Sequence, residues 1–288
     1  MTAASAAAVP DMLGRPIEIP DRPLRLVSLA PSITETVYAL GRGDWLVGVT
    51  AVCDYPAAAR ALPKVGGIAA PNLEQIVRLR PDLVLATAEG NARDLLDRLE
   101  RLGLRTFALQ PDSYDRVVDS IRVLGRALNA DQAAHRVAGE VEQSVQRVRE
   151  LVAGRSRPRV LYLIWTDPLI AAGAGTYLHD LLELAGGRNI VWEHTGAYPR
   201  LNWEQVVDRA PEVILLADHR DDGEQAARGS GDMPPDWHTW QAVPAIRTGR
   251  VRAVPSNTIL RPGPRVGEGV VRLARAIHPE AFGAQEGK

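Results

Sequence analysis

A short segment that occurs twice is the strongest constraint on the fold of this chain. Residues 72–85 read NLEQIVRLRPDLVL and residues 202–215 read NWEQVVDRAPEVIL, an offset of 130 positions without a gap. The Asn, Glu, Gln, Val, Pro and final Leu coincide. Because chance rarely produces such a match, we predict two similarly built lobes with a cleft between them. The repeat also places Glu74 and Glu204 at equivalent points, which a two-fold symmetric partner can contact.

Length, charge and cysteine content exclude several classes of protein. The 288 residues suffice for two ordinary domains, and the composition is that of a globular protein. Lys and Arg number 34 against 35 Asp and Glu, so no basic surface for nucleic acid or an anionic membrane is expected. Cys53 is the only cysteine, which rules out an internal disulfide. No apolar run reaches 18 residues, the length that a membrane-spanning helix needs.

Strands and helices are predicted to alternate along the chain, which is typical of α/β lobes with largely parallel sheets. In the first lobe we expect strands at 24–30, 45–52, 82–86 and 104–109, and helices at 32–41, 72–80, 91–102 and 113–128. In the second we expect strands at 160–165, 213–217 and 250–254, and helices at 176–185, 202–209, 237–246 and 264–278. Ser32 with Glu35 and Asn72 with Gln75 have the spacing of helix-capping pairs. Residues 218–235 are polar and predict a loop.

One long helix is predicted between the two lobes. Small apolar residues recur there at spacings of three and four, at Ala134, Val137, Ala138, Val141, Val145, Val148 and Val152. This stripe predicts a helix over 131–153, about 35 Å long, with Asn129 as its cap. The predicted domains are residues 14–130, a connecting helix at 131–155, and residues 156–283. Because a single helix is stiff, we expect little movement of one lobe against the other.

Enzymatic chemistry finds little support in the sequence. The six histidines form no closely spaced pair, which argues against a metal site built by the protein. Cys53 lies in an expected loop with no histidine that can be placed beside it, so we interpret it as a half-buried free thiol. The AGAGT segment at 172–176 lacks the lysine of a phosphate-binding loop and is interpreted as a strand-to-helix turn.

Several side chains are candidates for binding. Tyr55, Trp165 and Tyr198 follow or end expected strands, and in open α/β sheets ligands bind beyond the carboxyl ends of the strands. Large flat side chains there suit a bulky, partly apolar ligand, with ordinary core packing as the alternative, chiefly for Trp165. Arg261 or Arg265, after a later strand, can reach ligand oxygens or remain solvated.

Glu74 and Glu204 both occupy the second position of a capped helix. The helix dipole alone favours an acid in the first turn by about 0.3–1 kcal/mol. A symmetric pair of projecting carboxylates also suits paired arginines on a dimeric partner, and we prefer this interpretation.

The combined motifs resemble the helical-backbone metal receptor superfamily, the substrate-binding proteins of ABC importers for cobalamin, ferric siderophores and haem. The resemblance covers roughly residues 14–280 and is carried by RLVSLAPSITETVYALG, CDYP, the repeated segment, AGAGTYLHDLLELAGGRNI and WQAVPAIRTGRV. The cobalamin-binding branch is the most similar. The resemblance implies two α/β lobes bridged by one long helix, and a corrinoid held in the cleft mainly by aromatic and apolar contacts.

The resemblance also implies roles for individual residues. Glu74 and Glu204 match glutamates that dock on arginines of the dimeric permease. Tyr55 and Tyr198 match aromatic contacts, Asn257 and Arg261 match a polar pair, and Ile68 and Thr87 stand where aromatic residues can occur. That departure keeps cobalamin, another corrinoid and a siderophore as candidate ligands. The candidate ligand-binding residues are Ser32, Tyr55, Ile68, Trp165, Tyr198, Asn257 and Arg261.

These features together predict a monomeric solute-binding protein without catalytic residues or an intrinsic cofactor. The ligand, a cobalamin or another metal-bearing chelate, brings its own metal. The resemblance implies a periplasmic or lipid-anchored location, although the N-terminus lacks the basic and apolar regions of an export signal. The alternatives are a ferric-siderophore or haem binder, a cytoplasmic protein that handles corrinoids or metal cofactors, and an enzyme on the same scaffold.

Overall fold

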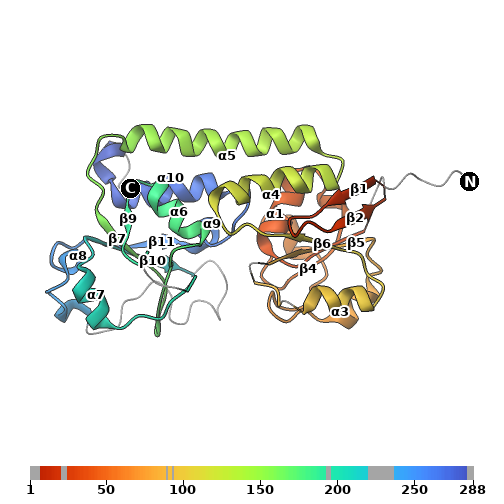
Figure 1. Cartoon of the computed structure of the whole chain (residues 1–288), viewed down its shortest axis with the longest axis horizontal. Coiled ribbons are helices and arrows are strands. Elements are labelled where there is room, and N and C mark those ends of the chain that lie inside the picture. The colour runs from red at the N-terminus through yellow and green to blue at the C-terminus, as the bar shows by residue number, and fades with distance from the viewer. Residues whose placement is uncertain are drawn as a thin grey trace, which may run out of the picture. The chain divides into compact units, whose positions relative to one another are not determined.

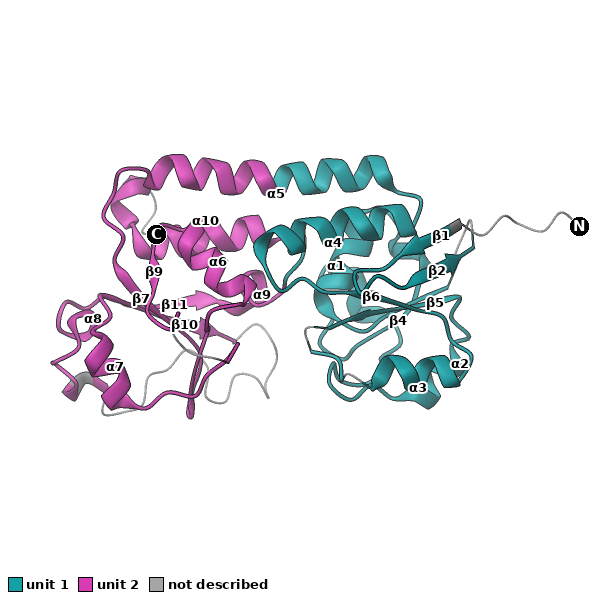
Figure 2. Ribbon diagram, viewed as in Figure 1, with its two compact units in different colours: residues 1–140, 262–264 teal, residues 141–261, 265–288 magenta. Residues whose placement is uncertain are grey.

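The computed structural model describes residues 7–20, 25–88, 90–92, 94–192, 196–219 and 237–283. The chain divides into two compact units (Figure 2). Residues 1–140 with 262–264 form unit 1, and residues 141–261 with 265–288 form unit 2. Among the described residues, no helix is both long and apolar enough to cross a membrane.

Unit 1 is built on a parallel sheet with the strand order β4-β3-β5-β6 (Figure 1). These strands are β3 (Leu26–Ser28), β4 (Leu46–Val49), β5 (Leu83–Thr87) and β6 (Thr106–Leu109). A separate antiparallel hairpin pairs β1 (Ala7–Pro10) with β2 (Pro16–Ile19). The central strands are continuous apolar runs, because both faces of the sheet are covered.

Helices alternate with the strands of unit 1. They are α1 (Pro31–Ala39), α2 (Leu73–Arg78), α3 (Leu95–Arg101) and α4 (Tyr114–Ala127), with short 3₁₀ segments η1 (Gly43–Trp45) and η2 (Ala57–Ala61). On one face of the sheet, β3 and β5 side chains pack with Ile76 of α2 and with Leu95 and Leu99 of α3. Each of these side chains is buried, so the pattern of apolar residues accounts for the core.

Unit 2 has a mainly parallel sheet with the strand order β11-β10-β7-β8, and β9 also pairs with β7. Its strands are β7 (Arg159–Thr166), β8 (Leu169–Ala171), β9 (Arg188–Asn189), β10 (Val213–Asp218) and β11 (Val251–Pro255). Only β8 runs antiparallel among these pairings, as the return strand of a tight hairpin after β7. The two mainly parallel sheets confirm the predicted α/β fold class.

The helices of unit 2 are α6 (Tyr177–Leu184), α7 (Trp203–Arg209), α8 (Pro244–Arg247), α9 (Ser256–Ile259) and α10 (Val266–Ile277), with 3₁₀ segments η4 (Trp237–Thr239) and η5 (Pro279–Phe282). Val206 of α7 and Ile246 of α8 pack on the β7 and β10 side chains of one sheet face. Trp203, Trp237 and Trp240 close the edge of this core, and the rings of Trp203 and Trp240 stack with centroids 5.3 Å apart.

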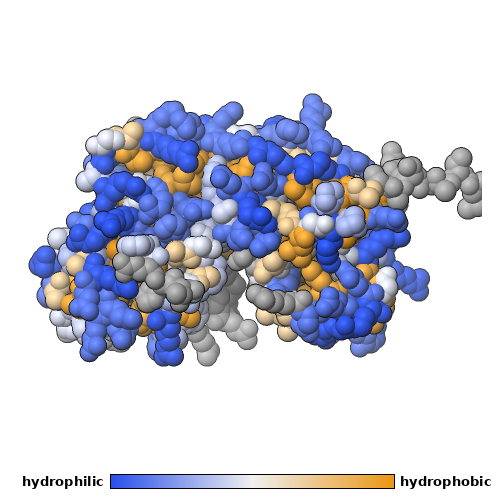
Figure 3. All heavy atoms as spheres, viewed as in Figure 1, coloured by the Kyte–Doolittle hydropathy of each residue, from blue (hydrophilic) through white to orange (hydrophobic). Residues whose placement is uncertain are grey.

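The long helix predicted from the apolar stripe is present as α5 (Asp131–Val152), and the boundary between the units falls within it. The stripe is buried from Ala134 to Val148. The edge of the molecule along which α5 runs in Figure 1 is mainly hydrophilic in Figure 3, as expected for a helix with one apolar face.

Two of the predicted caps are wrong. Ser32 does not cap α1, because the helix already begins at Pro31, whose ring presets the helical φ and whose nitrogen carries no hydrogen to satisfy. Ser32 therefore lies inside the first turn. Asn129 does not cap α5, since its φ of 49° places it in the left-handed region just after α4. Asparagine tolerates that conformation, so Asn129 ends one helix and the next begins after Ala130.

Two predicted helices also differ from the structure. The helix expected at 237–246 is two short pieces, η4 and α8, because a residue that precedes proline disfavours the helical region and Pro244 begins a new helix. Helix α3 begins at Leu95, four residues later than predicted. The loop predicted at 218–235 lies almost wholly outside the described residues, apart from Asp218 and His219.

Candidate functional site

Two of the predicted ligand-binding residues of unit 1, Ser32 and Tyr55, follow the carboxyl ends of its parallel strands. Ser32 comes after β3, Tyr55 after β4, and Thr87 is the last residue of β5. Because β4, β3 and β5 are neighbours and parallel, their carboxyl ends share one edge of the sheet. The sheet therefore gathers these residues along one edge of the unit.

Ser32 lies in a tightly packed environment. It is 6% exposed, and its backbone carbonyl accepts a hydrogen bond from the Thr36 hydroxyl at 2.7 Å. The backbone at Gly263 passes so close that an added Cβ would lie 3.1 Å from the Ser32 carbonyl oxygen. The Ser32 hydroxyl itself has no hydrogen-bond partner among the described residues.

The loop that carries Tyr55 is anchored by hydrogen bonds, whereas the Tyr55 ring is exposed. The Lys64 ammonium donates to the Cys53 and Ala59 carbonyls, each at 3.0 Å, and Arg60 Nε donates to the Asp54 carbonyl at 3.1 Å. Tyr55 is 48% exposed. A large ring on an anchored loop loses little conformational entropy when it contacts a ligand.

Cys53, beside this loop, is fully buried, so the prediction of a half-buried thiol is wrong. Its sulfur lies 3.2 Å from the Thr34 hydroxyl and 3.0 Å from the Thr50 hydroxyl. The free thiol therefore belongs to the packed base of the loop.

Asn91 organises this edge of unit 1, although no sequence pattern predicts that role. Its Oδ1 accepts from the Thr87 backbone N–H at 2.8 Å, and its Nδ2 donates to the carbonyls of Ile68 at 2.8 Å and Leu29 at 3.3 Å. One amide thus connects the ends of β3 and β5 to the loop that holds Ile68. No local sequence pattern marks Asn91, because its three hydrogen-bond partners come from separate segments of the chain.

In unit 2, Trp165 and His219 form an aromatic pair at the carboxyl ends of β7 and β10. Their ring centroids lie 5.6 Å apart at 52°. Trp165 Nε1 donates to the Asp167 carbonyl at 2.8 Å, which holds the indole, and the ring is partly exposed. His219 Nε2 lies 2.9 Å from the Ile164 carbonyl oxygen, and the residue is 9% exposed. His219 was not predicted, since a single histidine after a strand carries no sequence signal.

Tyr198 lies beside β8, and Asn257 follows the carboxyl end of β11. Tyr198 is 44% exposed, and its flanking carbonyls at Ala197 and Pro199 accept the N–H groups of Gly173 and Ala171. Asn257 lies in α9, directly after β11, and is half-buried.

Of the two candidate arginines, Arg261 is half-buried and follows α9. Arg265 Nη2 donates to the Asn257 carbonyl at 3.1 Å, so this side chain supports the position of Asn257.

Thr176 caps α6 with a 3.2 Å bond from the His179 N–H, which confirms the strand-to-helix turn predicted for 172–176.

The two repeated helices place Glu74 and Glu204 as predicted, at the second helical position and exposed. Asn72 accepts the Gln75 N–H at 3.0 Å. Asn202 and Gln205 form a complete capping box, with bonds of 2.9 and 3.0 Å. The surroundings differ, however. Glu74 forms an ion pair with Arg78 at 2.9 Å, whereas the equivalent position after Glu204 is Asp208.

The chemistry of these residues is that of recognition. Among the described residues, no group of three or more His, Cys, Asp or Glu side chains is arranged to hold a metal ion. Exposed aromatic rings, a free hydroxyl, an amide and a guanidinium can hold a bulky ligand by contact and hydrogen bonding. Two α/β units that carry such residues are typical of one class, the solute-binding proteins.

Comparison with known proteins confirms this class and the family resemblance. The chain belongs to the periplasmic binding protein family, whose model matches residues 26–258. This is a family of binding proteins and not of enzymes. The chain is 31% identical over 265 residues to the vitamin B12-binding protein of Vibrio cholerae serotype O1, which covers 92% of this chain and 91% of that protein.

Solved structures agree with the assignment. The crystal structure of the periplasmic vitamin B12-binding protein of Vibrio cholerae has a TM-score of 0.78 and 30% identity, over 91% of this chain and 98% of that one. The apo form of the periplasmic heme-binding protein of Roseiflexus sp. RS-1 has a TM-score of 0.77 and 28% identity, over 89% and 98%. The chain is therefore a solute-binding protein of ABC import.

Proposed function

We propose that this protein captures cobalamin or a related corrinoid and delivers it to the permease of an ABC importer. The observation that carries this proposal is the placement of solvent-accessible aromatic rings at the carboxyl ends of parallel strands, with Tyr55 after β4 in unit 1 and Trp165 at the end of β7 in unit 2. Its support from the comparisons is the similarity to vitamin B12-binding proteins in sequence and in structure.

The remaining candidates suit the chemistry of such a ligand. A corrinoid is a broad, largely apolar ring that carries amide side chains at its edge. In this proposal Tyr55, Ile68, Trp165 and Tyr198 contact the ring. The Ser32 hydroxyl, Asn257 and Arg261 hydrogen-bond to the amide groups at its edge. The metal arrives with the ligand, so the protein supplies no metal site.

Haem is the second candidate ligand. Ile68 and Thr87 leave fewer aromatic contacts in unit 1 than a cobalamin binder of this type can have. The structure of a heme-binding protein is also similar, at 28% identity.

For delivery, we propose that Glu74 and Glu204 dock on arginines of a dimeric permease. Both carboxylates project from the first turn of equivalent helices, one in each unit. We propose an extracytoplasmic location, as for the periplasmic binding protein family, with the protein acting as a monomer.

Titration calorimetry tests the ligand directly. We expect one cobalamin per chain, with a dissociation constant between nanomolar and micromolar, about −8 to −12 kcal/mol. A visible corrinoid spectrum should persist after desalting. Tyr55→Ala with Tyr198→Ala should weaken binding at least about tenfold, because each removes a large apolar contact. The control is Leu102→Ala, which shortens an equally exposed apolar side chain after α3. Binding of haem alone would replace the corrinoid assignment with the second candidate.

A further inference from the structure

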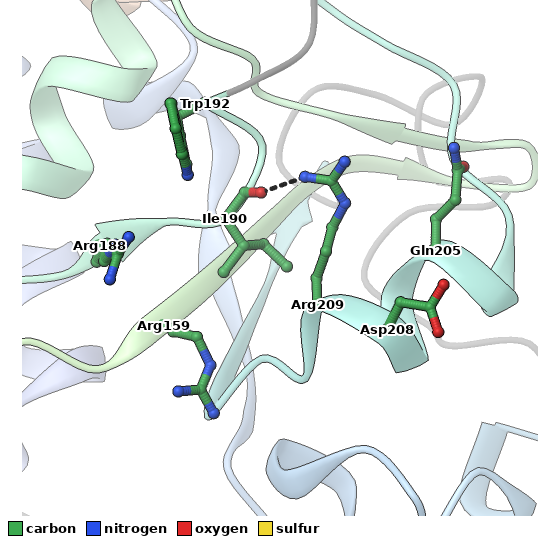
Figure 4. A pocket seen from close by; sticks show the side chains of 7 residues that line it. All are labelled: Arg159, Arg188, Ile190, Trp192, Gln205, Asp208 and Arg209. Carbon is green, nitrogen blue, oxygen red and sulfur yellow. Dashed lines mark hydrogen bonds between the residues drawn. The ribbon is translucent and has the colours of Figure 1, made fainter.

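A pocket of about 330 Å³ in unit 2 is lined by three arginines. Arg159, Arg188 and Arg209 come from β7, β9 and α7, and Figure 4 shows them around the side chain of Ile190. Trp192, 50% exposed, stands at one side. We call this site the arginine pocket. Ile190 is buried, so the pocket has an apolar floor with guanidinium groups around it.

The arginine pocket lies away from the residues proposed to bind the ligand. Arg159 is the first residue of β7, and Trp165 is close to the last. The strand rises about 3.3 Å per residue, so the two lie about 20 Å apart. Arg188 likewise begins β9, which pairs in parallel with the first residues of β7. The pocket therefore belongs to the amino-terminal edge of the sheet, and the corrinoid proposal does not use it.

The charges of the arginine pocket are only partly balanced. Arg159 Nε donates to the Ala210 carbonyl at 2.9 Å, and its Nη1 lies 3.6 Å from a Glu212 carboxylate oxygen. Arg209 Nη1 donates to the Ile190 carbonyl at 2.5 Å, which holds its side chain over the pocket (Figure 4). Arg188 is exposed, and its guanidinium forms no ion pair or hydrogen bond within the described part of the chain. A carboxylate placed here would receive charge-assisted hydrogen bonds.

The pocket is continuous with the helix that carries the proposed docking residue Glu204. Gln205 and Asp208 of α7 also line it. Glu204 lies one helical turn before Asp208, so both carboxylates project from the same side of α7. An acidic ridge, Glu204 and Asp208, thus borders the arginine pocket. A surface with both signs of charge fits a protein partner better than a uniformly anionic membrane, which the ridge would repel.

We propose that the arginine pocket receives an acidic side chain of the permease, so that unit 2 docks through charges of both signs. The permease arginine proposed above contacts Glu204, and a neighbouring carboxylate of the same permease surface enters the pocket beside Arg188. Trp192 provides an apolar wall for the residue that carries this carboxylate. This inference depends on the proposed delivery to a permease.

Charge reversal at Arg188 tests the inference. Binding to the importer's permease in nanodiscs would be measured for Arg188→Glu, Arg188→Lys and the control Arg149→Glu. Arg149 is another exposed arginine of unit 2, on α5, with no partner among the described residues. We expect Arg188→Glu to weaken binding at least about tenfold, as for the loss of a charge-assisted contact. Arg188→Lys should keep most of the affinity, and the control should match the wild type.

A double charge reversal identifies the partner group. Replacing the contacting permease Asp or Glu with Arg should restore the binding of Arg188→Glu. Corrinoid affinity and the melting temperature should be unchanged in all three variants.

Several outcomes would overturn the proposal. Wild-type binding by Arg188→Glu would remove the arginine pocket from the interface. If the double variant Glu74→Ala with Glu204→Ala then fails to bind the permease, docking through the glutamates is still supported. If the double variant also binds the permease normally, the delivery proposal is wrong as well. If the wild type binds anionic phosphatidylglycerol vesicles and Arg188→Glu abolishes that binding, the pocket contacts the membrane and not the permease. The last outcome is that millimolar inorganic phosphate competes with permease binding and no permease variant restores the binding of Arg188→Glu. The arginine pocket would then be a site for small anions.

Discussion

The two glutamates show how identical residues acquire different properties from their neighbours. Glu74 and Glu204 share a repeat position and a capped helix. In unit 1, Arg78 pairs with Glu74, although both side chains are about three-quarters exposed. Such a pair contributes little to stability, because solvent screens it. In unit 2 the corresponding position is Asp208, which adds a second negative charge beside Glu204.

We expect Glu74→Ala with Glu204→Ala to leave folding within about 0.5 kcal/mol of the wild type and corrinoid affinity unchanged, since both side chains are exposed. The same variant should lose permease binding and uptake. Of the single variants, Glu204→Ala should cost more, because Glu74 must first exchange its contact with Arg78. Urea unfolding, calorimetry and transport assays measure these effects. If the double variant supports uptake at the wild-type rate, the glutamates do not dock, and their interaction with the helix dipole is the explanation for both.

At the scale of elements, glycines mark where α4 and α5 meet and where they do not. Gly125 of α4 lies against α5, and an added Cβ there would lie 2.2 Å from the Ala134 Cβ. This contact is possible only for a residue without a side chain. Gly139 lies on α5, about one and a half turns after Ala134. An added Cβ at Gly139 would have no neighbour within 4 Å. Both glycines lie within helices, so the difference between them comes from packing.

Gly139→Ala should therefore stabilise the protein by about 0.5–1 kcal/mol, because alanine loses less backbone entropy in a helix. Gly125→Ala, the matched substitution, should destabilise it by about 1–3 kcal/mol, because the helices must move apart. Chemical unfolding followed by circular dichroism measures both. Equal effects of the two substitutions would show that α4 and α5 do not pack closely in solution.

At the scale of the whole molecule, α5 is one unbroken helix in which the boundary between the units falls. Its apolar stripe is buried over several turns, so it is not a loose linker. A continuous helix resists bending more than a flexible linker does. From this we predict that ligand capture involves little rearrangement of the chain.

Solution X-ray scattering with and without cobalamin checks this prediction. The radius of gyration and the scattering profile should agree within error between the two states. A Gly139→Pro variant serves as a comparison, because proline in a helix interior removes a backbone hydrogen bond and bends the helix. A marked compaction of the wild type on binding would contradict a rigid connection.

The parts of the fold that follow from local order are visible in the sequence. The apolar stripe of α5, the caps at Asn72 and Asn202 and the buried strands depend on residues close together in the chain. Periodicity and capping are short-range effects, so the sequence is enough to predict them. The repeat also predicts the equivalent positions of Glu74 and Glu204. Local rules fail at Ser32 and Asn129, where a neighbouring proline and the end of a preceding helix decide the geometry.

Tertiary structure alone decides which distant residues become neighbours. Asn91 connects segments around Leu29, Ile68 and Thr87, and His219 meets Trp165 across two strands. The arginine pocket likewise draws on β7, β9 and α7. None of these groups has a spacing that a sequence pattern can reveal, because strand order and helix packing bring their members together. The sequence therefore determined the elements and the family of this protein, and the packing of those elements determined which residues gather at its candidate sites.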